Sequence, residues 1–119
     1  MNFCITTSQL IEILGARPLT QLKTENETMA GITTDTRNLT PGNLFVALVG
    51  DKFDGHNFLE EAITKGAAAA IVSKQTSLRA RELPEIPLLL VEDTLKAYQA
   101  IARWWRDHFS IPIIAVTGS

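Results

Sequence analysis

The sequence is short of cysteine, of charge imbalance and of long apolar runs, and each shortage excludes a class of protein. Cys4 is the only cysteine among the 119 residues, so no disulfide can form within the chain. Because it stands in an apolar start, we expect Cys4 to be a small buried residue. The net charge of −2 provides no basic surface for nucleic acid. No apolar run approaches the ~20 residues that span a bilayer.

The composition is that of an ordinary soluble globular domain. Hydrophobic residues make up 45% of the chain and charged residues 20%. A chain of 119 residues is long enough for one domain with a buried core. The N-terminus lacks a basic segment followed by an apolar one, so a signal peptide is not predicted. We therefore expect a cytoplasmic protein that binds neither membranes nor nucleic acid.

Apolar spacing and turn residues predict the first half of the fold. Thr6 and Gln9 are spaced as a capping box ahead of an apolar helical face. Gly15 follows that face and supplies a left-handed stop at the end of the helix. Strands are expected at residues 29–34 and 44–49, and residues 19–22 are compatible with a third, short strand.

The second half predicts two more helices that alternate with strands. Asn57 and Glu60 begin a helix that Gly66 closes, with an apolar face made of Phe58, Leu59, Ala62 and Ile63. Asp93 caps a longer helix, whose expected inner stripe is Leu95, Tyr98, Ile101, Ala102, Trp105 and Phe109. Strands are expected at residues 67–72, 88–91 and 113–116, and a surface connection at 75–87. The fold class is therefore α/β, with a small mixed, mainly parallel sheet and about three helices.

Residues 31–58 carry two polar loops that follow predicted strands. For the first, Thr34-Asp35-Thr36-Arg37, two interpretations stay open. Asp and Thr side chains commonly hydrogen-bond their own backbone in turns, and Asp35 and Arg37 are spaced for a surface ion pair. Alternatively, a hydroxyl and adjacent amides bind the edge of a base or sugar, while Arg37 orders the turn or binds a phosphate.

The second loop, residues 51–56, also has two interpretations. Gly55 allows the backbone to approach a ligand closely, Lys52 suits a phosphate, and Phe53 suits a stacked base. The other interpretation is a solvated turn with Phe53 in the core. His56 has no second His, Cys or carboxylate at ligand spacing, so no metal site is predicted.

The sequence shows no set of catalytic residues. It contains no recognisable Ser/His/Asp or Cys/His arrangement and no carboxylate pair placed for acid–base chemistry. The final Thr117-Gly118-Ser119 follows an apolar run, which fits either a plain strand exit or the start of a phosphate-binding loop. Such a loop needs Gly-Lys-Thr or Gly-Lys-Ser downstream. The 119 residues alone are not predicted to be a self-contained enzyme.

One stretch resembles a known family. Residues 32–74, ITTDTRNLTPGNLFVALVGDKFDGHNFLEEAITKGAAAAIVSK, resemble the N-terminal domain of the Mur ligases, which extend the stem peptide of peptidoglycan. The closing IPIIAVTGS resembles the first strand of that family's central ATPase domain, entering its phosphate loop. The resemblance implies a UDP-substrate-binding domain at residues 1–111 and the beginning of the ATPase domain at residues 112–119.

The resemblance also implies the chemistry of a longer enzyme. In these ligases ATP phosphorylates the terminal carboxylate of a nucleotide-sugar peptide, an amine attacks the acyl phosphate, and Mg²⁺ neutralises phosphate charge. The N-terminal domain holds the uridine diphosphate end of the substrate. ATP and Mg²⁺ are thus expected for the longer enzyme, whereas no cofactor, no metal and no activity are expected for these residues alone.

The matching motifs imply site residues by position. Six residues in the two loops match positions that bind the uridine nucleotide: Thr36, Asp35, Arg37, Asp51, Lys52 and Phe53. Thr36 matches a Ser/Thr that contacts the nucleotide, while Asp35 and Arg37 either contact it or brace the turn. Gly118 and Ser119 match the start of the ATP-binding loop.

Two branches of the family share this pattern. One adds the third residue of the stem peptide and the other adds D-alanyl-D-alanine. The ending Thr-Gly-Ser and the Trp105-Arg106 pair favour the dipeptide-adding branch. Its substrates would be UDP-N-acetylmuramoyl-tripeptide and D-alanyl-D-alanine, and a monomer is expected. The related uridine-nucleotide module of lipid A acyltransferases remains an alternative, which would continue into hexapeptide repeats.

Overall fold

The computed structural model describes residues 4–19, 28–73 and 86–108. Most of the expected connection at 75–87, and the expected strand and loop at 113–119, lie outside the described residues. The centre of the fold is a five-stranded sheet in the order β2-β7-β6-β5-β4. Its strands are β2 (Arg17–Pro18), β4 (Ile32–Thr33), β5 (Leu44–Val46), β6 (Ala69–Val72) and β7 (Leu88–Leu90).

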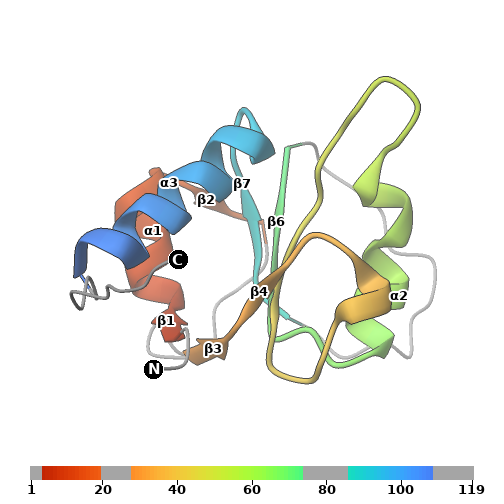
Figure 1. Cartoon of the computed structure of the whole chain (residues 1–119), viewed down its shortest axis with the longest axis horizontal. Coiled ribbons are helices and arrows are strands. Elements are labelled where there is room, and N and C mark those ends of the chain that lie inside the picture. Colours follow the sequence, from red (N-terminus) through yellow and green to blue (C-terminus); the bar gives the residue numbers. More distant parts are fainter. Residues whose placement is uncertain (1–3, 20–27, 74–85, 109–119) are drawn as a thin grey trace, which may run out of the picture.

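The sheet is mixed and mainly parallel, as the sequence predicts. Strands β4, β5, β6 and β7 pair in parallel, and β2 pairs antiparallel with β7 at one edge. A separate antiparallel pair is formed by β1 (Cys4–Thr6) and β3 (Thr28–Ala30). The three α-helices are α1 (Thr7–Leu14), α2 (Leu59–Thr64) and α3 (Thr94–His108). Helices α1 and α3 cover one face of the sheet and α2 covers the other (Figure 1).

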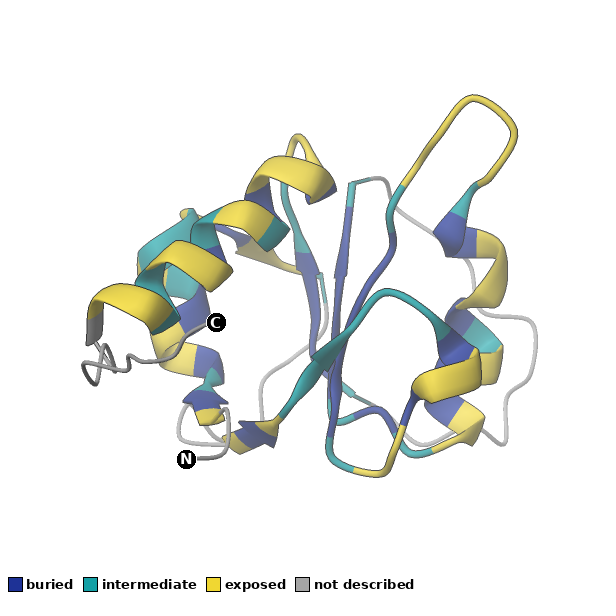
Figure 2. Ribbon diagram, viewed as in Figure 1, coloured by how far each residue is buried: buried dark blue, intermediate teal, exposed yellow. Residues whose placement is uncertain are grey.

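Alternating side chains on the buried strands build two apolar cores. Leu44 and Val46 of β5 pack with α1 and α3, whereas Phe45 between them packs with α2. In β6, Ile71 belongs to the first core and Val72 to the second. Figure 2 shows the buried strands between the two helical layers. This period of two is why a nearly continuous apolar run folds as a central strand that is covered on both faces.

Side-chain caps define the ends of two helices as predicted. The Thr6–Gln9 capping box begins α1, and Gly15 ends it with a φ of 61°. The Oδ1 atom of Asp93 accepts hydrogen bonds from the amides of Leu95 (2.9 Å) and Lys96 (3.1 Å) at the start of α3. These caps satisfy amide groups that would otherwise lack an intrahelical partner.

The second helix begins later than predicted. Asn57 does not cap it, because Asn57 lies inside a short 3-10 helix, η2 (Gly55–Phe58), which precedes α2. Asp54 caps η2 instead, and its Oδ1 atom accepts a hydrogen bond from the His56 amide at 2.9 Å. Gly66 follows α2 with a φ of 101°, in the left-handed region that favours glycine.

Two predicted strands are corrected. The strand expected at 29–34 is divided at Gly31, whose φ of 86° turns the chain from β3 into β4 in a different sheet. The strand expected at 44–49 ends at Val46, and Val49 is exposed. Of residues 19–22, which were compatible with a strand, residues 20–22 lie outside the described residues, and Leu19 directly follows strand β2.

Predicted burial was wrong at Cys4 and partly wrong on α3. Cys4 is exposed on β1. Ile101 and Tyr98 of the expected stripe pack on the core together with Ala97 and Trp104. Leu95 and Ala102 of that stripe are exposed, and Phe109 lies outside the described residues. Trp104 and Trp105 are both half-buried, and Trp104 packs on the core. None of the described helices has the length and apolar character needed to cross a membrane.

Candidate functional site

A pocket of about 740 Å³ lies at the carboxyl ends of β4 and β5. The segments that leave these strands, residues 34–37 and 48–50, form part of its wall. Glu61 of α2 and Leu95 of α3 complete it from opposite faces of the sheet. Parallel strands bring their exit loops to one edge, so the two loops singled out in the sequence meet here.

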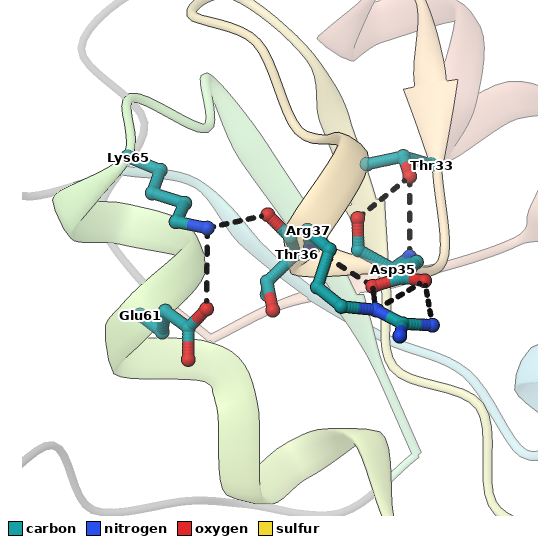
Figure 3. Close-up of polar contacts among 6 residues, drawn as sticks. All are labelled: Thr33, Asp35, Thr36, Arg37, Glu61 and Lys65. Carbon is teal, nitrogen blue, oxygen red and sulfur yellow. Dashed lines mark hydrogen bonds and ion pairs between the residues drawn. The ribbon is translucent and has the colours of Figure 1, made fainter.

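The turn after β4 is held by its own side chains (Figure 3). The Thr33 hydroxyl donates to the Asp35 carbonyl oxygen (3.0 Å) and accepts from the Asp35 amide (3.1 Å). The Asp35 carboxylate caps the 3-10 helix η1 (Thr36–Asn38) by accepting from the Arg37 amide at 2.9 Å. The turn is therefore braced by its own side chains, as the first of its two interpretations predicts. The same bracing holds its polar groups in fixed positions, which the second, ligand-binding interpretation also requires.

Asp35 and Arg37 form an ion pair in which two guanidinium nitrogens donate hydrogen bonds to the carboxylate. Arg37 Nη2 donates to Asp35 Oδ2 at 2.8 Å, and Arg37 Nε lies 3.1 Å from both carboxylate oxygens. The hydrogen bond from Arg37 lowers the pKa of the Asp35 carboxyl below its ordinary value, and Asp35 raises the pKa of Arg37. The Arg37 side chain remains 86% exposed and lines the pocket wall. Its guanidinium group carries a permanent positive charge, and its Nη1 atom does not take part in the hydrogen bonds to Asp35.

Lys65 ties the turn to α2. Its ammonium group donates to the Thr36 carbonyl oxygen at 2.9 Å and lies 3.4 Å from Glu61 Oε2 (Figure 3). Thr36 itself is buried, with 5% of its surface exposed. The contact joins two segments that are 29 positions apart, and it fixes one wall of the pocket relative to the helix behind it.

The loop after β5 turns back on itself, so that Val49 and Asp54 form an antiparallel bridge. The Gly50 amide donates to the Phe53 carbonyl oxygen and the Gly55 amide to the Leu48 carbonyl oxygen, each at 2.7 Å. The loop projects beyond the carboxyl edge of the sheet (Figure 1). Phe53 stacks on Phe58, with ring centroids 5.6 Å apart and an interplanar angle of 18°. Phe53 is thus outside the core, and Phe58 was wrongly expected to face inward.

The pocket gathers exposed apolar side chains. Among the described residues, the large hydrophobic side chains that stay exposed are Val49, Phe53, Phe58 and Leu95, and all of them line this pocket. They come from three separate segments of the chain. Exposed apolar groups scattered over a surface need no explanation, but convergence on one concave site is typical of a ligand-binding surface.

His56 is buried beside the pocket loop and binds protein groups. Its side chain is 2% exposed, its Nδ1 atom lies 2.7 Å from Asp54 Oδ1, and its Nε2 atom accepts from the Ser73 amide at 3.0 Å. The described residues contain no group of three His, Cys, Asp or Glu placed to hold a metal ion.

Four of the six predicted site residues line the pocket. Asp35, Thr36, Arg37 and Phe53 meet there, whereas Asp51 and Lys52 are exposed in the same loop and are not part of its lining. Gly118 and Ser119 lie outside the described residues. The sequence did not single out five further lining residues, which are Leu48, Val49, Phe58, Glu61 and Leu95.

Most of the missed residues are apolar, and within apolar runs they are indistinguishable from core positions. The one available signal was the position of Val49 and Phe58 at the two ends of the glycine-containing loop. A second hollow of about 630 Å³ lies between the end of α1 and the start of α3, beside Ser73.

The protein is thus an α/β domain with a polar and aromatic pocket at the carboxyl ends of its parallel strands, which is the position where ligands commonly bind in sheets of this kind. The model described as "Mur ligase family, catalytic domain" matches residues 28–105. The chain belongs to the Mur ligase family, which confirms the resemblance noted in its sequence.

Its relatives and structural neighbours agree. The chain is 50% identical over 88 residues to a Synechocystis UDP-N-acetylmuramoyl-tripeptide–D-alanyl-D-alanine ligase, covering 74% of this chain and 19% of that one. It is 40% identical over 115 residues to the Escherichia coli K12 protein of the same name, covering 97% and 23%. A crystal structure of MurF from Acinetobacter baumannii matches 92% of this chain and 22% of that one, with a TM-score of 0.74 and 27% identity.

A MurF ligase from Thermotoga maritima, solved in complex with ADP, is also similar, with a TM-score of 0.54 and 28% identity. The matched region covers 66% of this chain and 17% of the Thermotoga maritima chain. The chain therefore spans about a fifth of the length of the proteins it matches.

Proposed function

We propose that this chain binds the uridine diphosphate end of UDP-N-acetylmuramoyl-tripeptide, in an ATP-dependent ligase that adds D-alanyl-D-alanine during peptidoglycan precursor synthesis. In this proposal residues 1–111 form the substrate-binding domain and residues 112–119 begin the ATPase domain. Family membership and the names of the curated relatives support the assignment.

The observation that carries the proposal is the pairing of an aromatic wall with a fixed cation in one pocket. The stacked rings of Phe53 and Phe58 present an apolar surface on which a flat base can stack. Arg37, held by Asp35, supplies donors and positive charge for a phosphate group. A nucleoside diphosphate has the same two parts, a flat base and a charged diphosphate.

The remaining predicted residues take supporting roles. Thr36, fixed through its carbonyl oxygen by Lys65, keeps the turn in place beside the nucleotide. Lys52 and Asp51 lie on the exposed loop beside Phe53, where Lys52 can meet a phosphate when the larger substrate is bound. We assign Asp35 to bracing the turn, because both of its carboxylate oxygens are already engaged by Arg37.

ATP and Mg²⁺ belong, in this proposal, to the longer enzyme. When bound there, they supply the phosphoryl group that activates the substrate carboxylate and the charge that stabilises its transfer. The acidic and histidine side chains of the described residues do not form a metal-binding group, so no step of the reaction is assigned to them. We expect the 119 residues alone to be inactive, monomeric and cytoplasmic, and the net charge of −2 argues against a nucleic-acid partner.

Two alternatives fit the same pocket. One is the branch that adds the third stem-peptide residue, and the other is the nucleotide module of a lipid A acyltransferase. The dipeptide-adding name shared by the relatives at 50% and 40% identity favours the main proposal over both. The next few codons of the gene separate the last alternative, because a ligase continues into Gly-Lys-Thr or Gly-Lys-Ser.

Isothermal titration calorimetry of the 119-residue chain with UDP and with ADP tests the binding role. We expect UDP to bind more tightly than ADP. Leu95→Ser, which alters the pocket wall, should weaken UDP binding. Ala102→Ser, on an exposed position of the same helix, is the matched control and should not. Equal binding of the two nucleotides, or UDP affinity that is unchanged in Leu95→Ser, would contradict the proposal.

A further inference from the structure

The buried histidine has a defined tautomer. The Ser73 amide is a donor, so the Nε2 atom that faces it at 3.0 Å must carry a lone pair. The Asp54 carboxylate is an acceptor, so the Nδ1 atom that faces it at 2.7 Å must carry the hydrogen. Only the neutral ring protonated at Nδ1 satisfies both neighbours, and at 2% exposure water cannot replace either.

These contacts attach the pocket loop to the sheet at two points. The Gly55 amide bonds to the Leu48 carbonyl oxygen after β5, and the His56 ring bonds to the Ser73 amide after β6. A side chain at Gly55 would meet the Leu48 backbone at 2.8 Å, so the loop lies directly against the strand exit. The rings of Phe53 and Phe58, which line the pocket, stand on either side of this attached segment.

We propose that His56 is a positioning residue of the nucleotide site: through its Nε2 bond to the Ser73 amide, it holds the wall formed by Phe53 and Phe58 at the carboxyl edge of the sheet. The identity of the ligand rests on the proposed function, but the positioning role rests on the contacts alone. His56 does not line the pocket and acts only through the loop.

Two variants of similar size separate the two contacts of the ring. His56→Gln places an amide oxygen near the Nε2 position, where it can accept a hydrogen bond from the Ser73 amide. His56→Asn can reach Asp54 but not Ser73. All of these proteins, the parent included, also carry His108→Gln, which removes the second histidine of the sequence.

Nuclear magnetic resonance follows the amide signals of Phe53, Phe58 and Ser73. The tautomer of the His56 ring is read from its nitrogen–proton correlations. UDP affinity is measured by calorimetry at pH 7.5.

We expect the Nδ1-protonated tautomer at pH 7.5 in the ligand-free protein. Loss of the buried bond in His56→Asn should shift the Phe53 and Phe58 signals and weaken UDP binding about tenfold, whereas His56→Gln should restore both.

Two results would overturn the positioning role. One is the opposite tautomer, and the other is wild-type wall signals and UDP affinity in His56→Asn. A protein that shows the expected ring and wall behaviour but binds no UDP would contradict the proposed function and leave the positioning role intact.

Discussion

Gly55→Ala tests how closely the pocket loop lies against the sheet. A Cβ atom at Gly55 would stand 2.8 Å from the Leu48 nitrogen, 2.9 Å from the Leu48 oxygen and 3.0 Å from the Ala47 Cα atom. Ordinary contacts of this kind are about 3.5–4.0 Å, and all three atoms belong to the backbone, so the loop must move away from the strand. The substitution should therefore destabilise the fold.

The magnitude follows from two opposing terms. Overpacking in a close contact costs about 1–3 kcal/mol. Replacing glycine by alanine also restricts the unfolded chain, which offsets about 0.4–1 kcal/mol. The net loss is about 1–2 kcal/mol of unfolding free energy, which for a domain of this size lowers the melting temperature by roughly 4–15 °C.

Gly50→Ala is the matched control in the same loop. Its nearest neighbour beyond the adjacent residues would be the Phe53 oxygen at 4.0 Å, and Gly50 does not have a positive φ. That variant should be as stable as the parent protein or slightly more stable. Thermal and urea unfolding of both variants, monitored by circular dichroism, gives the comparison. If Gly55→Ala is as stable as Gly50→Ala, the loop does not lie against the strand as described.

Three further predictions concern the pocket walls. Phe53→Ala should weaken UDP binding about tenfold in calorimetry with little change in melting temperature, because the ring is exposed; a large loss of stability would place it in the core instead. Lys65→Met should lower the unfolding free energy by about 1 kcal/mol in urea titrations, since the Thr36 carbonyl oxygen loses its donor; no change would mean that water replaces it. Asp35→Asn keeps an oxygen for the Arg37 amide but loses the ion pair. Because folding lowers the pKa of Asp35, its stabilising effect is present above its ordinary pKa of 3.8 and is lost as the pH falls further. The difference in melting temperature between Asp35→Asn and the parent should therefore close below that pH, and a gap that widens in acid would refute the pairing.

Local signals in the sequence predicted much of the fold, because the physics behind them is local. The capping box at Thr6 and the stop at Gly15 depend on residues three or four positions apart, and both are found. The central strands β5 and β6 were recognisable as short apolar runs bounded by glycine. The pocket loops were recognisable because polar turn residues follow directly after such strands.

The face of α3 could not be predicted in the same way. Apolar side chains lie on both sides of the predicted stripe, and Leu95 was wrongly placed inside it. Ile101 and Tyr98 of the predicted stripe do pack on the core, but they are joined there by Ala97 and Trp104 in place of Leu95 and Ala102. Leu95 is left exposed, and it contributes to the pocket wall.

Apolar residues of the site were missed for a related reason. Val49 and Phe58 are close to core residues in the sequence. Hydrophobicity alone does not distinguish a buried core side chain from an exposed one that lines a pocket. That distinction depends on which strand exits meet at the sheet edge, and on contacts such as that between His56 and Ser73, which lie 17 positions apart. Neither is encoded in a short window of sequence.

In the proposed function, the pocket at the carboxyl ends of β4 and β5 holds a uridine nucleotide. Nuclear magnetic resonance of the amide groups during a titration with UDP tests it most directly. We expect the largest changes in chemical shift on residues 34–37, on residues 48–53, and on Phe58 and Leu95. Changes centred instead on the second hollow, at Ser73 and Lys96, would contradict it, as would spectra unaffected by UDP.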